Sequence, residues 1–207
     1  MTATALAIYL VFTLLASVWR GWRQYRRTGD HGFRGFSGPV GSVAWFAGAF
    51  LTIGWFASLL TFLPDHWSGV PSLAVVLPAE VRVVGLALMT IAAAVALVAQ
   101  WDMRDSWRVG VDKTETTELV TTGLFRWVRN PIFAAMAAVC LGLVLAVPNL
   151  IACVAFVATL IGIELQVRKV EEPYLLRVHG ERYRAYARRV GRFVPGVGRL
   201  APVSLEE

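Results

Sequence analysis

Long apolar stretches separated by short polar ones are the main pattern along this 207-residue chain. The hydrocarbon core of a bilayer is about 30 Å thick, so a helix needs about 20 mainly apolar residues to cross it. Residues 3–19, 40–63 and 81–101 meet this requirement, because each stretch is almost free of charged side chains. These stretches therefore predict three transmembrane helices.

A fourth apolar stretch, residues 132–163, is too long for one crossing and holds the pair Pro148-Asn149 near its middle. Proline disfavours helical backbone in the residue before it, and a Pro-Asn pair suits a turn. We therefore expect a hairpin of two short helices here. Together with the first three stretches, it gives about five transmembrane helices.

Residues 165–189 mix apolar, aromatic and charged side chains at spacings compatible with a helix at the membrane surface. Pro173 and Gly180 are expected to divide this segment into pieces. The fold class predicted is thus an all-α integral membrane protein with a cytoplasmic C-terminal helical segment.

Arginine and lysine gather in alternate connections between the predicted helices. Short cytoplasmic loops carry an excess of these residues, so their distribution predicts orientation. The stretch after the first helix, the stretch before the hairpin and the C-terminal part are basic, whereas the connection after the second helix holds Asp65, His66 and Glu80. This pattern predicts the N-terminus outside and the C-terminus in the cytoplasm.

The first apolar stretch is followed, not preceded, by basic residues, which favours a retained helix over a cleaved signal peptide. With no organelle signal recognised, the expected location is a prokaryotic plasma membrane.

Composition supports a lipid environment, since 57% of the residues are hydrophobic and 16% are charged. The formal net charge of +6 could suggest nucleic acid, but the basic residues lie beside predicted membrane ends. Attraction to anionic lipid headgroups explains them more simply, so no nucleic-acid partner is predicted. Cys140 and Cys153 form no CxxC motif and have no nearby histidine, so we interpret them as packing residues and predict no metal site.

One domain, residues 1–207, is the simplest organisation because no internal repeat is visible. Residues 1–100 carry almost no charge inside their apolar stretches and are interpreted as a scaffold. Residues 101–200 combine charged and aromatic side chains around the hairpin, and we expect the chemistry there.

The first group of candidate residues lies in segments 105–110 and 119–133. Arg129 comes two positions before Pro131, which can serve as the first residue of a helix. A helix N-terminus has free N–H groups and a partial positive charge, and an arginine adds a bidentate fork, so this arrangement suits a carboxylate. The alternative is that Arg126, Trp127 and Arg129 only anchor the chain at the membrane interface.

The second group is acidic and basic at helical spacing: Glu164, Arg168, Glu171 and Glu172. An acid at the end of a transmembrane helix is costly unless it is paired or hydrated, which favours a functional role for Glu164. The alternative is an ordinary pair between Glu164 and Arg168 on a solvated helix face.

Two separate motifs resemble the isoprenylcysteine carboxyl methyltransferase family and the related phospholipid methyltransferases. Residues 119–133 resemble the family pattern Thr-x-Gly-x-Tyr-x-x-x-Arg-His-Pro-x-Tyr. Glu171-Glu172 with Gly180, Tyr183 and Tyr186 resembles its C-terminal Glu-Glu region. The resemblance covers roughly residues 105–195. In this chain Asn130 replaces the usual histidine, and Phe125 and Phe133 replace tyrosines.

The resemblance implies S-adenosyl-L-methionine as the cofactor, bound at the cytoplasmic face. Arg129 and Glu172 are the candidate catalytic residues. The cofactor-binding candidates are Gly123, Leu124, Arg129, Asn130, Pro131, Phe133, Glu171, Glu172, His179, Tyr183 and Tyr186. The substrate-binding candidates are Trp107, Arg108, Glu164 and Arg168.

Three functions compete. The first is methylation of a lipophilic or prenylated substrate, with O-methylation of an isoprenoid-like or lipid carboxylate ahead of N-methylation of a phospholipid headgroup. The second is an NADPH-dependent membrane reductase, since sterol reductases are similar in this region; Arg184, Arg188 and Arg189 could meet a ribose phosphate. The third is a non-catalytic scaffold or transporter, which the absence of mid-membrane charge in residues 1–100 disfavours.

Overall fold

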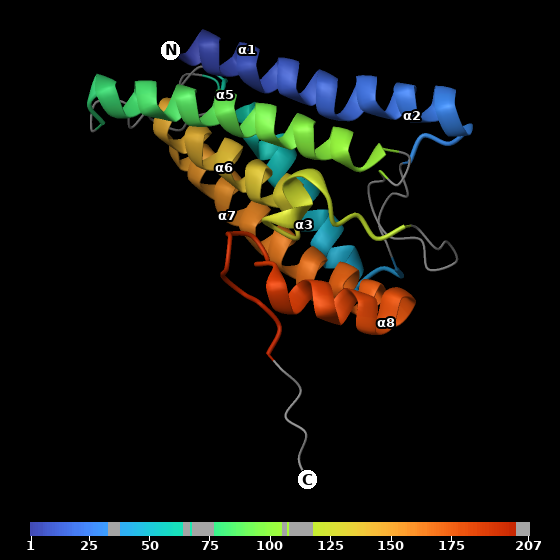
Figure 1. The fold of residues 1–207 in the computed structure, drawn as a ribbon. Helices are drawn as coiled ribbons and strands as arrows, with labels where there is room; N and C mark the ends of the chain where they lie inside the picture. Colours follow the sequence, from blue (N-terminus) through green and yellow to red (C-terminus); the bar gives the residue numbers. More distant parts are fainter. Residues whose placement is uncertain (33–37, 64–66, 68–76, 105–106, 108–117, 202–207) are drawn as a thin grey trace.

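The computed structural model describes residues 1–32, 38–63, 67, 77–104, 107 and 118–201, and in these residues the regular structure is helical throughout. The elements follow in the order α1 (Thr2–Thr13), the π-helix η1 (Leu14–Trp19), α2 (Arg20–Thr28), α3 (Val43–Leu60), α5 (Ala79–Asp102), the 3₁₀-helix η3 (Gly123–Arg126), α6 (Pro131–Ala146), α7 (Leu150–Leu165), the π-helix η4 (Gln166–Glu171) and α8 (Glu172–Arg189). Figure 1 shows this order by colour. The all-helical membrane fold is confirmed.

Four helical stretches are long and apolar enough to cross a membrane: Thr2–Thr28, Val43–Leu60, Ala79–Asp102 and Leu150–Arg189. α6 is shorter, with 16 residues. It forms the expected hairpin with α7. Asn149 caps the start of α7, where its side-chain oxygen accepts a hydrogen bond from the N–H of Ala152 at 2.8 Å. The structure therefore supports an integral membrane protein. In its hairpin, the short helix α6 is followed by α7, which is the first part of a longer helical stretch.

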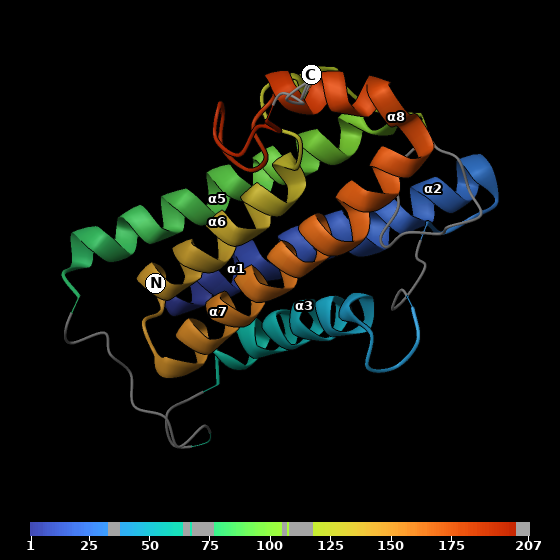
Figure 2. The same cartoon turned by 90° about the horizontal axis from the view of Figure 1, so that it is seen from below.

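The hairpin lies between the other helices, with α5 packed on α6 and α3 packed on α7 (Figure 2). α5 and α6 approach closely because glycines face each other. A Cβ on Gly142 would lie 2.8 Å from the carbonyl oxygen of Gly85, and one on Gly85 would lie 2.7 Å from that of Gly142. Small residues let helix backbones pack closely in lipid, whereas Ile53, Phe56, Ile91 and Val98 are exposed and suit a lipid-facing surface.

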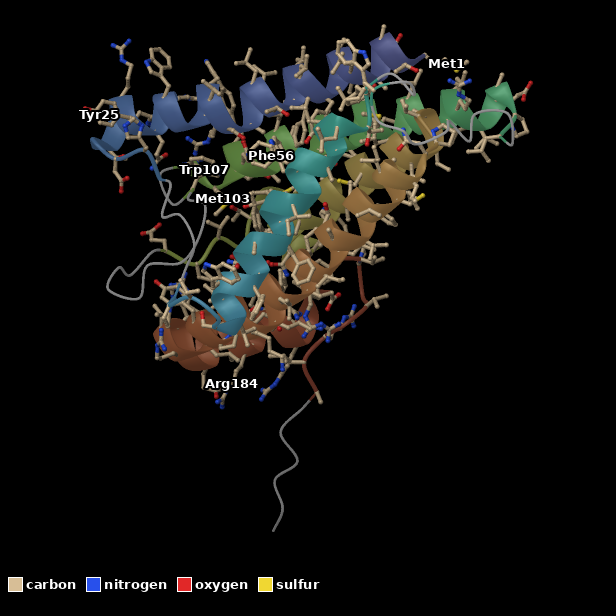
Figure 3. All side chains as sticks on the ribbon, turned by 180° about the vertical axis from the view of Figure 1, so that it is seen from behind. Met1, Tyr25, Phe56, Met103, Trp107 and Arg184 are labelled. Atoms are coloured by element: carbon tan, nitrogen blue, oxygen red, sulfur yellow. The ribbon has the colours of Figure 1, made fainter. Side chains whose placement is uncertain are left out.

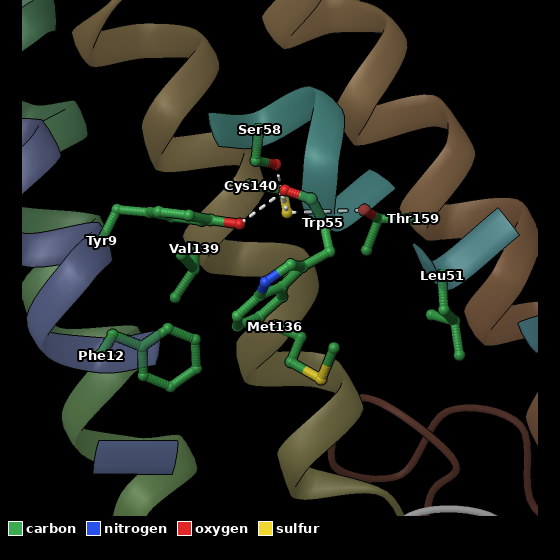
Figure 4. A pocket seen from close by; sticks show the side chains of 9 residues that line it. All are labelled: Tyr9, Phe12, Leu51, Trp55, Ser58, Met136, Val139, Cys140 and Thr159. Carbon is green, nitrogen blue, oxygen red and sulfur yellow. Dashed lines mark hydrogen bonds between the residues drawn. The ribbon is translucent and has the colours of Figure 1, made fainter. Parts of the chain in front are cut away.

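A buried polar contact chain fixes α1, α3, α6 and α7 to each other inside the bundle (Figure 4). The Tyr9 hydroxyl donates to the carbonyl of Trp55 at 2.8 Å, and the Ser58 hydroxyl lies 4.0 Å from the Cys140 sulfur. Cys140 also lies 3.6 Å from the hydroxyl of Thr159. These groups line a cavity of about 10 Å³, roughly the size of one water molecule. The Cys140 side chain is therefore buried inside the bundle, where it packs against Ser58 and Thr159.

The C-terminal helix differs from expectation at Pro173. We expected a break there, but α7, η4 and the start of α8 continue as helix through Pro173 without interruption. The π-helical turn of η4 ends just before Pro173, so the proline occupies the first turn of α8, where a missing N–H is tolerated. Gly180 does interrupt regular helix, with φ 50° and ψ −126°.

From the hairpin turn to the break at Gly180, residues 150–179 span about 45 Å as a helix, which is longer than the hydrocarbon core is thick. Since α7 begins at the hairpin turn and is apolar up to Glu164 in its last turn, α7 is the part that crosses the membrane. The charged η4 and α8 therefore extend beyond the hydrocarbon, and α8 bends over the end of the bundle (Figure 2).

Candidate functional site

The backbone before α6 pairs with the backbone after α8. The N–H of Arg129 donates to the carbonyl of Gly191 at 2.8 Å, and the N–H of Asn130 donates to that of Arg192 at 3.1 Å. The Asn130 side-chain amide donates to the same Arg192 carbonyl at 3.1 Å. Pro131 is the first residue of α6, where it needs no N–H. The two predicted motifs are thus joined at one end of the bundle.

Arg129, Glu172 and Arg192 form a buried ion-pair cluster, called here the Arg–Glu–Arg cluster. Nη2 of Arg129 and Nε of Arg192 each lie 2.8 Å from Oε1 of Glu172. Nη2 of Arg192 lies 2.9 Å from Oε2 of the same carboxylate. The Arg129 side chain is 1% exposed, so the cluster is shielded from solvent. A buried carboxylate is tolerated because both oxygens are paired with cations.

The Arg129 guanidinium also fixes the C-terminal end of α8. Its Nη1 donates to the carbonyls of Ala187 at 2.9 Å and Val190 at 2.5 Å, and its Nη2 donates to that of Gly198 at 3.0 Å. The last carbonyls of a helix have no partner within the helix, so these bonds cap α8. The terminal N–H groups of Arg129 are therefore engaged within the protein, which gives this residue a positioning role.

Glu171 and Glu172 have different environments although they are adjacent. Burial alone would raise the pKa of Glu172, but hydrogen bonds from Arg192 and Arg129 outweigh burial and hold that pKa below its usual value. Burial raises the pKa of Glu171 to about 7; a hydrogen bond from Gln166 opposes the rise and the charge of Glu172 adds to it. Nε2 of Gln166 lies 3.1 Å from the Glu171 carboxylate. Glu172 is thus the acid of the cluster, and Glu171 is the acid without a cation among its described partners.

The tyrosines of α8 face the segment before α6. Tyr183 and Tyr186 are buried, and their rings are 6.2 Å apart in an edge-to-face arrangement. The Tyr186 hydroxyl donates to the carbonyl of Phe125 at 2.6 Å, which ties α8 to η3. The rings pack with Leu119 and Ala187 in one apolar cluster. The Ala187 carbonyl also accepts a hydrogen bond from Arg129, so both tyrosines lie beside the Arg–Glu–Arg cluster.

The turn at Gly123 is held by α5. The N–H of Leu124 donates to the Asp102 carboxylate at 2.8 Å. Gly123 has a φ of 59°, and a Cβ there would collide with Asp102. Glycine is required because the position is both left-handed and crowded. Asp102 therefore connects the end of α5 to the segment that leads into Arg129.

The other predicted residues fall in three places. Trp107 is buried, and the Arg20 guanidinium carbon lies over its indole ring, 4.7 Å from the ring centroid. Arg108 lies outside the described residues. Glu164 and Arg168 form an ion pair on an exposed face, as the simpler interpretation expected. Phe133 is half-buried in the first turn of α6.

His179 is half-buried on α8, and its Nε2 has no hydrogen-bond partner among the described residues. Burial and the charge of Arg182 lower the pKa of His179, so the ring is neutral at neutral pH.

Two positioning residues, Arg192 and Asp102, are not among the site residues that the sequence predicted. Arg192 completes the cluster, and its only sequence signal was a basic residue following α8. Asp102 holds the Gly123 turn, and its signal was an acid at the end of an apolar helix, which is costly unless bonded.

The fold and this site define an integral membrane protein whose polar groups converge at one end of a helical bundle. Residues 81–182, nearly half of the chain, match the family model of phospholipid methyltransferases. This match runs from α5 into α8 and includes Arg129, Glu171 and Glu172; it supports the wider methyltransferase superfamily and does not single out the isoprenylcysteine branch. No curated protein and no solved structure matches the chain.

Replacing Glu172 by Gln should destabilise the protein by about 3 kcal/mol, because the buried Arg129 and the half-buried Arg192 then lose their carboxylate. Glu164→Gln is the matched control; its exposed pair is expected to contribute less than about 1 kcal/mol. Thermal unfolding in detergent measures both. Equal, small effects would mean that the Arg–Glu–Arg cluster does not hold α8 in place.

Proposed function

We propose that the protein is an S-adenosyl-L-methionine-dependent methyltransferase that acts on a lipophilic substrate at the cytoplasmic face of a membrane. The observation that carries the proposal is the coincidence of the methyltransferase family match with a polar site at the end of an apolar bundle. The distribution of basic residues supports the cytoplasmic side. Arg20 bonds to the carbonyl of Arg104, which joins the Arg-rich α2 to the end of the molecule that holds the polar site.

Unpaired groups near the Arg–Glu–Arg cluster suit the cofactor. Among the described residues, Glu171 bonds to Gln166 and to no cation, which suits the cofactor's ammonium group. The Nη1 of Arg192 has no hydrogen-bond partner within the described part of the chain and could meet its carboxylate. The segment from Gly123 to Pro131 and the rings of Phe133, Tyr183 and Tyr186 would surround the bound cofactor, with Asn130 and Arg129 fixing their position.

When bound, the cofactor supplies a methyl group on a positively charged sulfur. Transfer requires an acceptor aligned with that methyl group and the exclusion of water, more than strong acid or base groups. The buried Arg–Glu–Arg cluster keeps the surrounding backbone fixed, and the bilayer concentrates an apolar substrate beside it.

Two observations now favour an amine headgroup as the methyl acceptor over the carboxylate that the sequence had favoured. The family that matches is described as phospholipid methyltransferase. An ammonium acceptor must lose a proton, and the neutral ring of His179 has an unbonded Nε2 that could accept it. A carboxylate acceptor is already ionised at neutral pH and needs no base.

Cofactor binding should strengthen as pH rises from 5.5 to 7.5, because an ionised Glu171, with its pKa of about 7, attracts the cofactor's ammonium group. Glu171→Gln should weaken binding about tenfold at pH 7.5 and remove this pH dependence, whereas Glu164→Gln should change neither. Calorimetry with S-adenosylhomocysteine measures both effects. Thermal stabilisation by NADPH instead, with no response to S-adenosylhomocysteine, would favour a reductase.

The acceptor is identified by supplying the cofactor with a radiolabelled methyl group. We expect label in phosphatidylethanolamine, and we expect His179→Asn to lower kcat about 100-fold without changing cofactor affinity, since a proton acceptor contributes about that much. Label that appears instead as a base-labile ester of a prenylated carboxylate, at a rate independent of His179, would identify O-methylation and contradict the amine proposal.

A further inference from the structure

Three exposed tryptophans and two arginines form a surface where α2 meets the end of α5. We call it the Trp–Arg surface; it consists of Trp19, Trp22, Arg23, Arg26 and Trp101. Trp19, Trp22 and Trp101 are 39%, 52% and 59% exposed. In Figure 3, the labelled Tyr25, Met103 and Trp107 mark this end of the molecule.

The surface has a fixed geometry. The rings of Trp19 and Trp101 stack with their centroids 6.3 Å apart and an interplanar angle of 28°. The Arg23 guanidinium lies over both rings, 4.1 Å from the Trp101 centroid and 5.5 Å from that of Trp19. Arg26 lies over the Trp22 ring at 5.2 Å. Each guanidinium therefore makes a cation–π contact with an aromatic ring.

The surface is positive and lacks a protein counter-ion. Within the part of the chain that the structure describes, neither Arg23 nor Arg26 pairs with a carboxylate, and the helix from Thr2 to Thr28 contains no acid. Asp102, next to Trp101, is already engaged with the N–H of Leu124. A planar guanidinium with free edges forms bidentate hydrogen bonds with a phosphate.

The position of the Trp–Arg surface relative to the membrane indicates which ligand it binds. Trp101 lies at the end of the membrane-crossing α5, and Trp19 lies where the apolar part of the first helix ends. Exposed tryptophans at helix ends sit at the level of lipid headgroups. We propose that the Trp–Arg surface binds the phosphate of an anionic phospholipid headgroup, separate from the site at the start of α6.

Native mass spectrometry of the purified protein with equimolar phosphatidylglycerol and phosphatidylcholine tests this proposal; neither lipid carries a methylatable amine. The wild type should retain phosphatidylglycerol preferentially, and Arg23→Gln should reduce that preference about tenfold. Arg177→Gln is the matched control, because Arg177 also lies over an aromatic ring, Tyr174, but on α8. It should keep the preference.

Inorganic phosphate at the lipid's concentration should not displace the lipid, because the acyl chains contribute to binding; displacement would point to a free-phosphate site and overturn the lipid assignment. If Arg23→Gln unfolds, Arg26→Gln replaces it, with the same expected loss. No preference for phosphatidylglycerol in the wild type would overturn the proposal. Equal loss in the α2 and α8 variants would also overturn it, because it would show that net charge alone attracts the lipid.

Discussion

The pairing of Glu172 with Arg129 and Arg192 is the interaction on which the functional half of the molecule depends. Glu172 begins α8, Arg129 precedes α6, and Arg192 follows α8, so one carboxylate joins three segments. A buried carboxylate with only one cation would be costly, and the second arginine makes the arrangement stable. Arg129 then caps the end of α8, and the Tyr186 hydroxyl ties this helix to Phe125 in the segment before α6.

Polar contacts extend this organisation across the whole end of the bundle. Arg20 bonds to the backbone at the end of α5, Asp102 bonds to the Gly123 turn, and Tyr186 bonds to η3. Inside the bilayer, by contrast, the helices are held by close packing, which small residues such as Gly85 and Gly142 allow. Apolar packing therefore builds the support, and hydrogen bonds at one end position the polar groups proposed for chemistry.

The helices could be predicted from the sequence because apolar length is a strong signal in membrane proteins. Residues 81–101 correspond closely to α5, and the turn at Pro148-Asn149 was found from local chemistry. The continuous helix through Pro173 could not be predicted, because it depends on a π-helical turn whose hydrogen bonds leave no pattern of side chains. The ion pair of Glu164 and Arg168 followed from helical spacing alone.

The site residues that belong to sequence motifs could be predicted. Those that join the site only through tertiary contacts could not. Arg129 and Glu172 were chosen from separate motifs, and the structure brings them within 2.8 Å. The contacts of Arg192 and Asp102 cross many residues and have no local signature. The different states of Glu171 and Glu172 also depend on which neighbour each meets after folding, and adjacent positions in the sequence cannot distinguish them.

Hydrogen–deuterium exchange with and without S-adenosylhomocysteine tests most directly whether the cofactor binds where α6 and α8 meet. The account predicts slower exchange in residues 123–130 and 166–192 when the ligand is present, with little change in α1 and α3. Unchanged exchange in those residues under saturating ligand, or protection confined to α1 and α3, would contradict it.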